Sequence, residues 1–167
     1  MLPRYDIPNA APAPLREVQL LINSVDRHSG ADWLPDWLAE RGLGCAGARR
    51  ARALREALRA LVLAHNGRPL DAAAIATVNA SARRVALRVD AHGELDVETD
   101  GDALDRVVAI AFGAMLDGTW QRLKACRNCE WSFYDYSPNR SATWCSMQIC
   151  GNRHKTRTYR KRKSAAR

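Results

Sequence analysis

The chain has 167 residues, enough for one domain with a sizeable core and a small additional module but not for two full domains. Hydrophobic residues make up 47% of it, and no apolar run approaches the roughly 18 residues that a membrane span needs. The first 18 residues carry prolines and charges where a secretory signal needs a continuous apolar segment. We therefore expect a cytoplasmic protein with no membrane partner.

The net charge of +8 is unevenly distributed along the chain. Residues 1–119 contain 14 Lys and Arg against 16 Asp and Glu, whereas residues 120–167 contain 12 against 2. The basic character therefore belongs to the last third. This asymmetry favours a polyanionic partner for the C-terminal part, with nucleic acid ahead of an anionic membrane surface, and a solvated basic tail is the alternative.

The first predicted elements along the chain are helices. Apolar residues at helical spacing predict a short helix within 15–25 and a second one within 31–44, where Pro35 suits a first helical turn. Residues 48–64 place an apolar stripe opposite a basic face and are followed by Gly67, which can cap the end. This segment predicts an amphipathic helix with one apolar and one basic face.

The period then changes from helix to strand and back. Asp71 is placed to cap a helix in which Ile75 and Val78 face the core. Alternating apolar residues within 85–97, interrupted by a turn at Gly93, predict a β-hairpin.

A last helix of the N-terminal part follows this hairpin. Capping residues at 99–102 precede an apolar face, and Asp117-Gly118 follows it. The expected apolar residues are Leu104, Val107, Val108, Ala111, Met115 and Leu116. The predicted fold class is thus mainly α with a β-hairpin (α+β), with a helical domain over 15–124 and a smaller module over 125–167.

Four of the five cysteines form two close pairs, Cys126-x2-Cys129 and Cys145-x4-Cys150, separated by fifteen residues. Two thiol pairs brought together by an intervening hairpin or loop are typical of a tetrahedral S4 zinc site. We predict one structural Zn²⁺ ion bound by all four. A redox C-x-x-C would leave the second pair unexplained, and four thiolates leave no open position for a catalytic water. The remaining cysteine, Cys45, is expected to be a small buried hydrophobe.

The segment after Cys126 has too few apolar side chains for a core of its own, so the metal is expected to decide whether it folds. Its large aromatics, including Trp131 and Trp144, are expected to pack around the metal rather than to stack on bases. His154 could replace a thiol as ligand, but four cysteines already complete the shell, so a surface or phosphate-contacting role is expected.

Residues 151–167 contain eight Lys or Arg and no acid. A helix opened by Cys150 would place Arg153, Arg157 and Lys161 on one face at i, i+4 and i+8. Arginine binds phosphates or guanine edges, and asparagine pairs with adenine, so this helix is predicted to enter the major groove of double-stranded DNA. The predicted nucleic-acid contacts are Asn152, Arg153, Lys155, Arg157, Arg160 and Lys161.

Two rival functions stay open at this stage: an RNA-binding accessory protein and a zinc-stabilised protein-interaction module. Substituting Arg157 is expected to reduce the salt dependence of DNA binding. No catalytic triad, carboxylate pair or phosphate-binding glycine loop is recognised, so an enzyme is not expected. A chain this small covers little DNA, which favours a homodimer formed through the N-terminal domain, although no heptad supports one.

The segments "CRNCEWSFYDYSPNRS" and "WCSMQICGNRHKTRTYRKR" closely resemble the CGNR zinc finger, named for the tetrapeptide that begins at Cys150. The pieces "VQLLINSVD", "LPDWLAERGL", "RALREALRAL" and "VNA" are similar to landmarks of the ABATE domain, which precedes the finger in that family. The resemblance implies a bacterial, stress-linked transcriptional regulator that binds DNA through the finger and is associated with the nucleoid. It also implies zinc ligation by the four clustered cysteines.

The resemblance further implies a small-molecule effector for the N-terminal domain, sensed through an Arg-x-x-Arg element that corresponds here to Arg52 and Arg55. Asn23 and Asn79 would line the same cavity. The alternative is structural, because a buried polar group usually needs partners rather than a ligand. In that case the arginines lie in solvent or pair with Glu56 and other acids, and the asparagines bridge helices.

Overall fold

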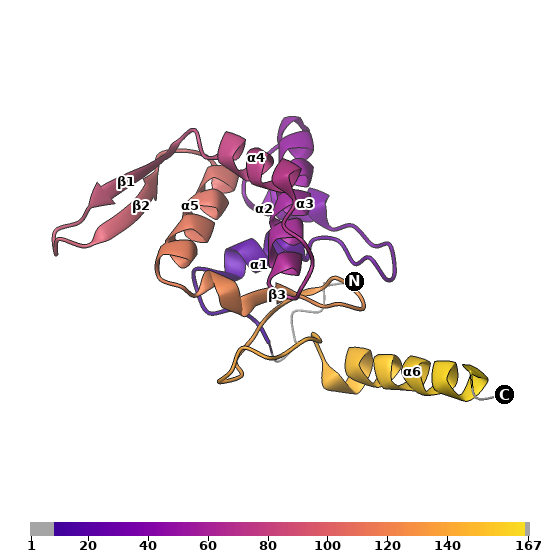
Figure 1. Ribbon diagram of the computed structural model, residues 1–167. Helices are drawn as coiled ribbons and strands as arrows, with labels where there is room; N and C mark the ends of the chain where they lie inside the picture. Colours follow the sequence, from indigo (N-terminus) through magenta and orange to yellow (C-terminus); the bar gives the residue numbers. More distant parts are fainter. Residues whose placement is uncertain (1–8, 166–167) are drawn as a thin grey trace.

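The structure, a computed structural model, describes residues 9–165. In Figure 1 five helices of the N-terminal part gather around one core, a two-stranded hairpin extends from one side, and the last helix leaves the body at another. No helix of the described chain is long and apolar enough to cross a bilayer. In chain order the elements are α1 (Arg16–Ile22), α2 (Leu34–Glu40), η1 (Cys45–Gly47), α3 (Ala48–Ala64), α4 (Ala72–Ser81), β1 (Val85–Val89), β2 (Leu95–Thr99), α5 (Ala103–Leu116), η2 (Trp120–Arg122), β3 (Leu123–Ala125), β4 (Ser132–Tyr134), η3 (Met147–Gly151) and α6 (Asn152–Ala165).

Aspartate side chains cap the starts of α4 and α5. The Asp71 carboxylate accepts hydrogen bonds from the first free N–H groups of α4, as predicted. At the start of α5, Asp102 accepts from the backbone of Asp105 while the Asp105 carboxylate accepts from the backbone of Asp102, which makes a capping box. The mainly α fold with one N-terminal hairpin is therefore confirmed.

Helix α3 is the centre of the core. Its apolar stripe, including Leu54, Leu58 and Val62, is buried, and α1, α2 and α4 pack around it. Helix α5 packs against α1 and α4 and carries the β1–β2 hairpin on its other side. This arrangement leaves α3 in contact with both the N-terminal helices and strand β3 of the C-terminal module.

Four side chains predicted to be buried are exposed. Ile75 of α4 faces solvent. Helix α4 turns Ala74 and Val78 towards the core instead. Met115 and Leu116 at the end of α5 are exposed, whereas Ala111 and Ala114 of the same turns are buried in the core. Cys45 lies in the exposed η1 turn between α2 and α3, so its interpretation as a buried hydrophobe is wrong.

The C-terminal module shares part of its core with the N-terminal helices. Leu123 and Ala125 of β3 and Tyr134 of β4 belong to the same buried cluster as α1, α3 and α5. A second, smaller cluster contains Trp131, Phe133 and three of the four clustered cysteines. The β3–β4 hairpin therefore has one side in the large core and the other against the thiols.

Candidate metal centre and nucleic-acid interface

The first cysteine pair lies at the tip of the β3–β4 hairpin. Cys126 directly follows β3, its carbonyl accepts from the N–H of Glu130 at 2.9 Å, and its N–H donates to the carbonyl of Trp131 at 2.9 Å. Glu130 has a φ of 58°, which turns the chain back towards β4. This tight turn places Cys129 beside Cys126.

The second pair lies where the chain enters the last helix. Cys145 comes directly before Ser146, whose side chain accepts from the N–H of Ile149 and so caps the η3 turn. Cys150 lies within η3, with its N–H bonded to the carbonyl of Ser146 at 2.9 Å. Helix α6 begins two residues later, so the last ligand is part of the turn that starts the helix.

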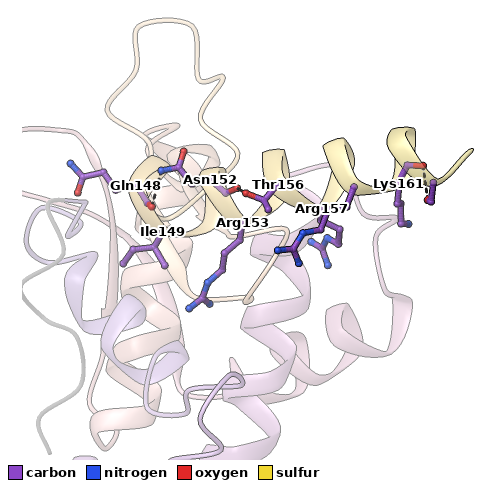
Figure 2. Close-up of a pocket in the computed structure, with 9 residues that line it drawn as sticks. Gln148, Ile149, Asn152, Arg153, Thr156, Arg157 and Lys161 are labelled. Carbon is purple, nitrogen blue, oxygen red and sulfur yellow. Dashed lines mark hydrogen bonds between the residues drawn. The ribbon is translucent and has the colours of Figure 1, made fainter. Parts of the chain in front are cut away.

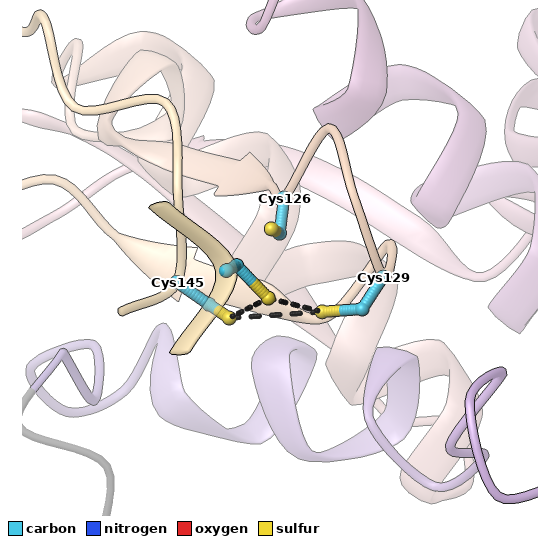
Figure 3. Close-up of side chains that lie close together, drawn as sticks. Cys126, Cys129 and Cys145 are labelled. Carbon is cyan, nitrogen blue, oxygen red and sulfur yellow. Dashed lines mark hydrogen bonds between the residues drawn. The ribbon is translucent and has the colours of Figure 1, made fainter. Parts of the chain in front are cut away.

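The four sulfur atoms converge on one point, as Figure 3 shows for the labelled cysteines. The Sγ atom of Cys129 lies 3.6 Å from that of Cys145 and 3.6 Å from that of Cys150, and the last two are 3.7 Å apart. All four ligand atoms lie within 4.8 Å of one another. Zinc–sulfur bonds of about 2.3 Å in a tetrahedron separate neighbouring sulfurs by about 3.8 Å, so the cluster has the size of an S4 zinc site.

The clustered thiols strongly affect one another's ionisation. Hydrogen bonds from Cys129 and Cys145 lower the pKa of Cys126 well below its ordinary value, while the contact with Cys126 raises the pKa of Cys129 to about 12. The pKa of Cys145 is raised by the same neighbours. Cys126 therefore ionises more easily than Cys129 and Cys145, and a divalent metal favours the thiolate form of each ligand that it binds.

Asn128 supports the thiolates from within the first turn. Its backbone N–H lies 3.5 Å from the Sγ of Cys126, and its side-chain amide lies 3.6 Å from the Sγ of Cys150. N–H groups that donate to sulfur favour the charged form of the ligand. The prediction of one structural zinc ion held by Cys126, Cys129, Cys145 and Cys150 is confirmed by this donor set and its spacing.

A buried ion pair, which the sequence analysis did not predict, organises the loop between the two cysteine pairs. Lys124 Nζ donates to Asp135 Oδ2 at 2.7 Å and also to the carbonyls of Arg140 and Ala142. The Asp135 carboxylate further accepts from the N–H of Ala142 and from the backbone and hydroxyl of Ser137. Burial alone would raise the pKa of Asp135, but the hydrogen bonds from Lys124 and Ser137 lower it below its ordinary value.

The finger is joined to the N-terminal domain by side-chain amides. Asn23, which follows α1, donates to the carbonyl of Ser132 at 2.9 Å and accepts from its N–H at 2.7 Å. Gln19 of α1 donates to the same carbonyl at 3.0 Å. After α3, Asn66 donates to the carbonyls of Ala125 and Thr143, both at 2.9 Å. Asn23 and Asn66 thus hold both ends of the metal module.

The four residues predicted to sense an effector have different surroundings. Arg55 is buried and binds Asp32 at 2.8 Å and Glu56 at 2.9 Å. Arg52 is exposed one turn earlier. Burial alone would raise the pKa of Asp32, but the hydrogen bond from Arg55 and the charge of Arg52 lower it. Both arginines therefore lower the pKa of one acid, Asp32.

The two asparagines of that set are not alike. The Asn23 amide is occupied by the backbone of Ser132, whereas Asn79 is exposed on α4. The structural alternative accounts for Asn23 and Arg55 through the bonds that they make. Ligand binding by Asn23, Arg52, Arg55 and Asn79 stays a prediction.

Helix α6 is exposed along nearly its whole length. Figure 2 shows its first turns, in which Arg153 and Arg157 point from the helix towards the rest of the molecule. Arg157 donates to the side-chain oxygen of Asn128 at 2.9 Å, and Arg153 lies 3.5 Å from the ring nitrogen of His28. These two arginines hold the base of the helix against the body.

The remaining predicted contacts on α6 are open to solvent. Lys155, Arg160 and Lys161 have no acidic partner among residues 9–165. Asn152 is exposed, and its side-chain amide donates to the carbonyl of Gln148 at 3.1 Å. A shallow groove runs along one side of the helix and is lined by Gln148, Ile149, Asn152, Arg153, Thr156, Arg157, Arg160, Lys161 and Ser164. Arg167, the last basic residue of the sequence, lies outside the described residues.

Trp131 and Trp144 pack on the metal module as expected, whereas Tyr136 and Tyr159 are exposed. Trp131 and Phe133 are buried beside the thiols. Trp144 is half-buried, and its ring lies 4.8 Å from that of His154 at an interplanar angle of 33°. His154 therefore packs on the metal module rather than ligating the metal.

A helical domain fused to a hairpin-and-helix module with four convergent thiols defines a zinc-finger protein with an α-helical N-terminal domain. Residues 18–118 match the model of the ABATE family, described as "Putative stress-induced transcription regulator", and residues 122–163 match that of the CGNR zinc finger. The chain belongs to the ABATE family and carries a CGNR zinc finger. A search of curated proteins found no match to it.

Proposed function

We propose that this chain is a DNA-binding transcriptional regulator whose zinc finger presents α6 to the major groove. The single observation that carries the proposal is the position of α6. It is a solvent-exposed helix of 14 residues, without a single acid, that starts two residues after the last zinc ligand. A helix with side chains is about 10–12 Å across and fits a major groove about 12 Å wide.

The metal supports this role by fixing the start of the helix. Cys150 lies in the turn before α6, and Asn128 connects the Cys150 sulfur to the guanidinium of Arg157. The first two turns are thereby attached to the zinc module, while Arg160 and Lys161 extend beyond it. A helix that is anchored at one end and free at the other can enter a groove without losing contact with its domain.

The side chains that line the groove along α6 match the two kinds of contact that DNA offers, phosphates and base edges. Arg160 and Lys161 supply charge for phosphates, and Asn152 and Thr156 supply hydrogen-bonding groups for base edges. Lys155 and Arg162, seven positions apart, add charge on another side of the helix. We infer that the cations set affinity and that the uncharged polar groups at the anchored end contribute sequence preference.

The family description supports a regulatory role, and regulation is then a property of the N-terminal domain. The buried contacts of Asn23 and Asn66 with the finger give that domain a direct connection to the metal module. Within this proposal the protein acts in the bacterial cytoplasm at the nucleoid, an effector binds near Arg52 and Arg55, and the four-sulfur site is structural rather than catalytic.

The test is a comparison of duplex DNA with structured RNA by fluorescence anisotropy, using zinc-loaded protein over a range of salt concentrations. Binding to duplex DNA should weaken with salt, with a slope of about 0.9 in log affinity per phosphate contact. Selection from a random duplex library should then enrich a sequence motif. Stronger binding to RNA would favour an RNA-binding accessory protein. Affinity for neither polymer would leave a protein-interaction module and contradict the proposal.

A further inference from the structure

Strand β1 has an open edge. The hairpin contains two strands among the described residues, β1 and β2, and it extends away from the helical core (Figure 1). Helix α5 packs mainly against β2, and within residues 9–165 no strand pairs with the far edge of β1. A two-stranded hairpin alone is only marginally stable, and an uncovered edge is a template for another strand.

One face of this hairpin is apolar and exposed. Leu87 pairs with Val97 and Val89 with Leu95 across the two strands, so these side chains share one face. Leu87 is 60% exposed, Val89 70% and Leu95 53%. The β1 edge has no proline, and its one charged residue, Arg88, lies on the opposite face. The usual protections of an edge strand are therefore absent from β1.

The backbone of β1 shows which groups point outward. The N–H of Asp90 donates to the carbonyl of Glu94 at 2.8 Å, so the backbone N–H and C=O groups of Asp90 point inward, towards the β2 side of the hairpin. Because inward and outward groups alternate along a strand, Val85, Leu87 and Val89 direct their N–H and C=O groups away from β2. The N–H of Val85 also points away from β2, but it bonds to the carbonyl of Ala82, so at this position the carbonyl alone is offered to a second copy.

We propose that the β1 edge binds a second copy of the same strand, in antiparallel register centred on Leu87. In that register Leu87 faces Leu87 of the second copy, and Val85 faces Val89, so outward-pointing residues meet one another. The same register places Arg84 opposite Asp90 and Arg88 opposite Ala86. By symmetry the complementary Arg84–Asp90 pair forms twice, and no like charges are opposed.

The competing edge does not have this complementarity. An antiparallel β2–β2 pairing centred on Val97 would place Asp96 opposite Glu98 twice, which opposes like charges. The β2 side also contacts α5, as described above. The β1 pairing would form a four-stranded sheet with a continuous apolar face. The inference does not depend on DNA binding, because α6 and the hairpin lie on separate parts of the molecule.

Sedimentation velocity of the zinc-loaded full chain over a wide concentration range tests the register. Arg84→Glu places an acid opposite Asp90 and should weaken the dimer about tenfold, since two cross-strand pairs change from attraction to repulsion. Arg84 also binds Asp100 of its own chain at 3.2 Å, so Asp100→Ala, which removes that ion pair alone, should leave the dimer intact. Arg83→Glu is the matched control, because it makes the same charge change one residue away, opposite Ala91, and should leave the dimer intact. Equal effects of the two substitutions would overturn the proposed register.

A second comparison tests the edge itself. Leu87→Lys brings two ammonium groups together at the symmetry axis and should give a folded monomer, whereas Leu70→Lys, at another exposed leucine, should stay dimeric. In the dimer the outward N–H of Leu87 should exchange slowly with solvent, and dilution or Leu87→Lys should abolish protection of the neighbouring Val89 N–H. A monomer at all concentrations, or a dimer that Leu87→Lys does not affect, would overturn the proposal.

Discussion

Asn23 and Ser132 pair like residues on neighbouring strands, although Asn23 follows a helix. The Asn23 side-chain amide donates to the Ser132 carbonyl at 2.9 Å and accepts from its N–H at 2.7 Å, and both residues are buried. One side chain thus takes the place of a third strand beside β4. The edge of the finger hairpin is thereby closed by the N-terminal domain, which explains how so small a module can be rigidly attached.

Asn23→Ala should therefore destabilise the whole chain. The substitution leaves the buried N–H of Ser132 without a partner, which costs about 1–3 kcal/mol, while Gln19 still satisfies the carbonyl. Urea unfolding of the zinc-loaded protein measures the loss. Asn79→Ala is the matched control, because Asn79 is exposed on α4 and its removal should change stability by less than about 0.5 kcal/mol. Equal losses for the two variants would contradict the assigned role of Asn23.

Removal of the metal should unfold only part of the finger. Leu123 and Ala125 of β3 and Tyr134 of β4 belong to the large core, whereas the cysteine turns have little apolar support of their own. A chelator should therefore abolish amide protection in residues 143–165 and leave it in β3 and β4, as followed by hydrogen exchange.

Zinc content provides the matched comparison for that experiment. Cys145→Ser removes a buried ligand and should reduce bound zinc well below one ion per chain, whereas Cys45→Ser alters an exposed thiol outside the cluster and should leave it unchanged. Loss of protection throughout β3 and β4 on chelation would show that the metal, rather than the shared core, holds the hairpin.

Sequence patterns predicted the elements well because the relevant interactions are local. The caps at Asp71 and Asp102 and the stripe of α3 depend on residues within a few positions, so their spacing is visible in the sequence. The zinc ligands were predictable for a different reason, since thiol pairs at such spacing have few other uses. The exposure of Ile75 and Cys45 was missed because it depends on which helices pack nearby.

Polar contacts between residues far apart in the chain could not be predicted from the sequence either. Asn23 reaches Ser132 across 109 positions and Asn66 reaches Thr143 across 77, so no periodicity could reveal either pair. Lys124 and Asp135 are closer in sequence, yet their pairing depends on a loop that folds back around them. Each is a polar residue adjoining a buried apolar segment, which was the one available signal.

Zinc affinity should depend on the buried Lys124–Asp135 ion pair. Lys124→Met leaves the Asp135 carboxylate buried without its cation and should cost about 3–5 kcal/mol. Because the same lysine binds the carbonyls of Arg140 and Ala142, the loop that leads to Cys145 should loosen. Competition with a zinc chelator should therefore show weaker zinc binding. If the affinity for zinc is unchanged, the loop does not depend on this pair.

Acid should destabilise the fold through His65. Burial and the nearby charge of Lys124 lower the pKa of His65 despite its hydrogen bond to the carbonyl of Leu123. The unfolded chain then takes up this proton at about pH 6.5, above the folded pKa, so the contribution is present above pH 6.5 and is lost as pH falls. His65→Asn should reduce this part of the pH dependence, measured by urea unfolding, whereas His92→Asn in the exposed turn should not.

Charge on the free end of α6 should set the salt dependence of DNA binding. Arg160 is exposed and has no acidic partner among residues 9–165, so Arg160→Ala should weaken binding and lower the slope of log affinity against log salt by about 1. Arg49→Ala, at an exposed arginine on α3, should alter neither quantity. Arg157→Ala should lower the slope similarly and also loosen the start of the helix, because Arg157 is bonded to Asn128. If Arg160→Ala and Arg49→Ala behave alike, α6 is not the surface that meets phosphate.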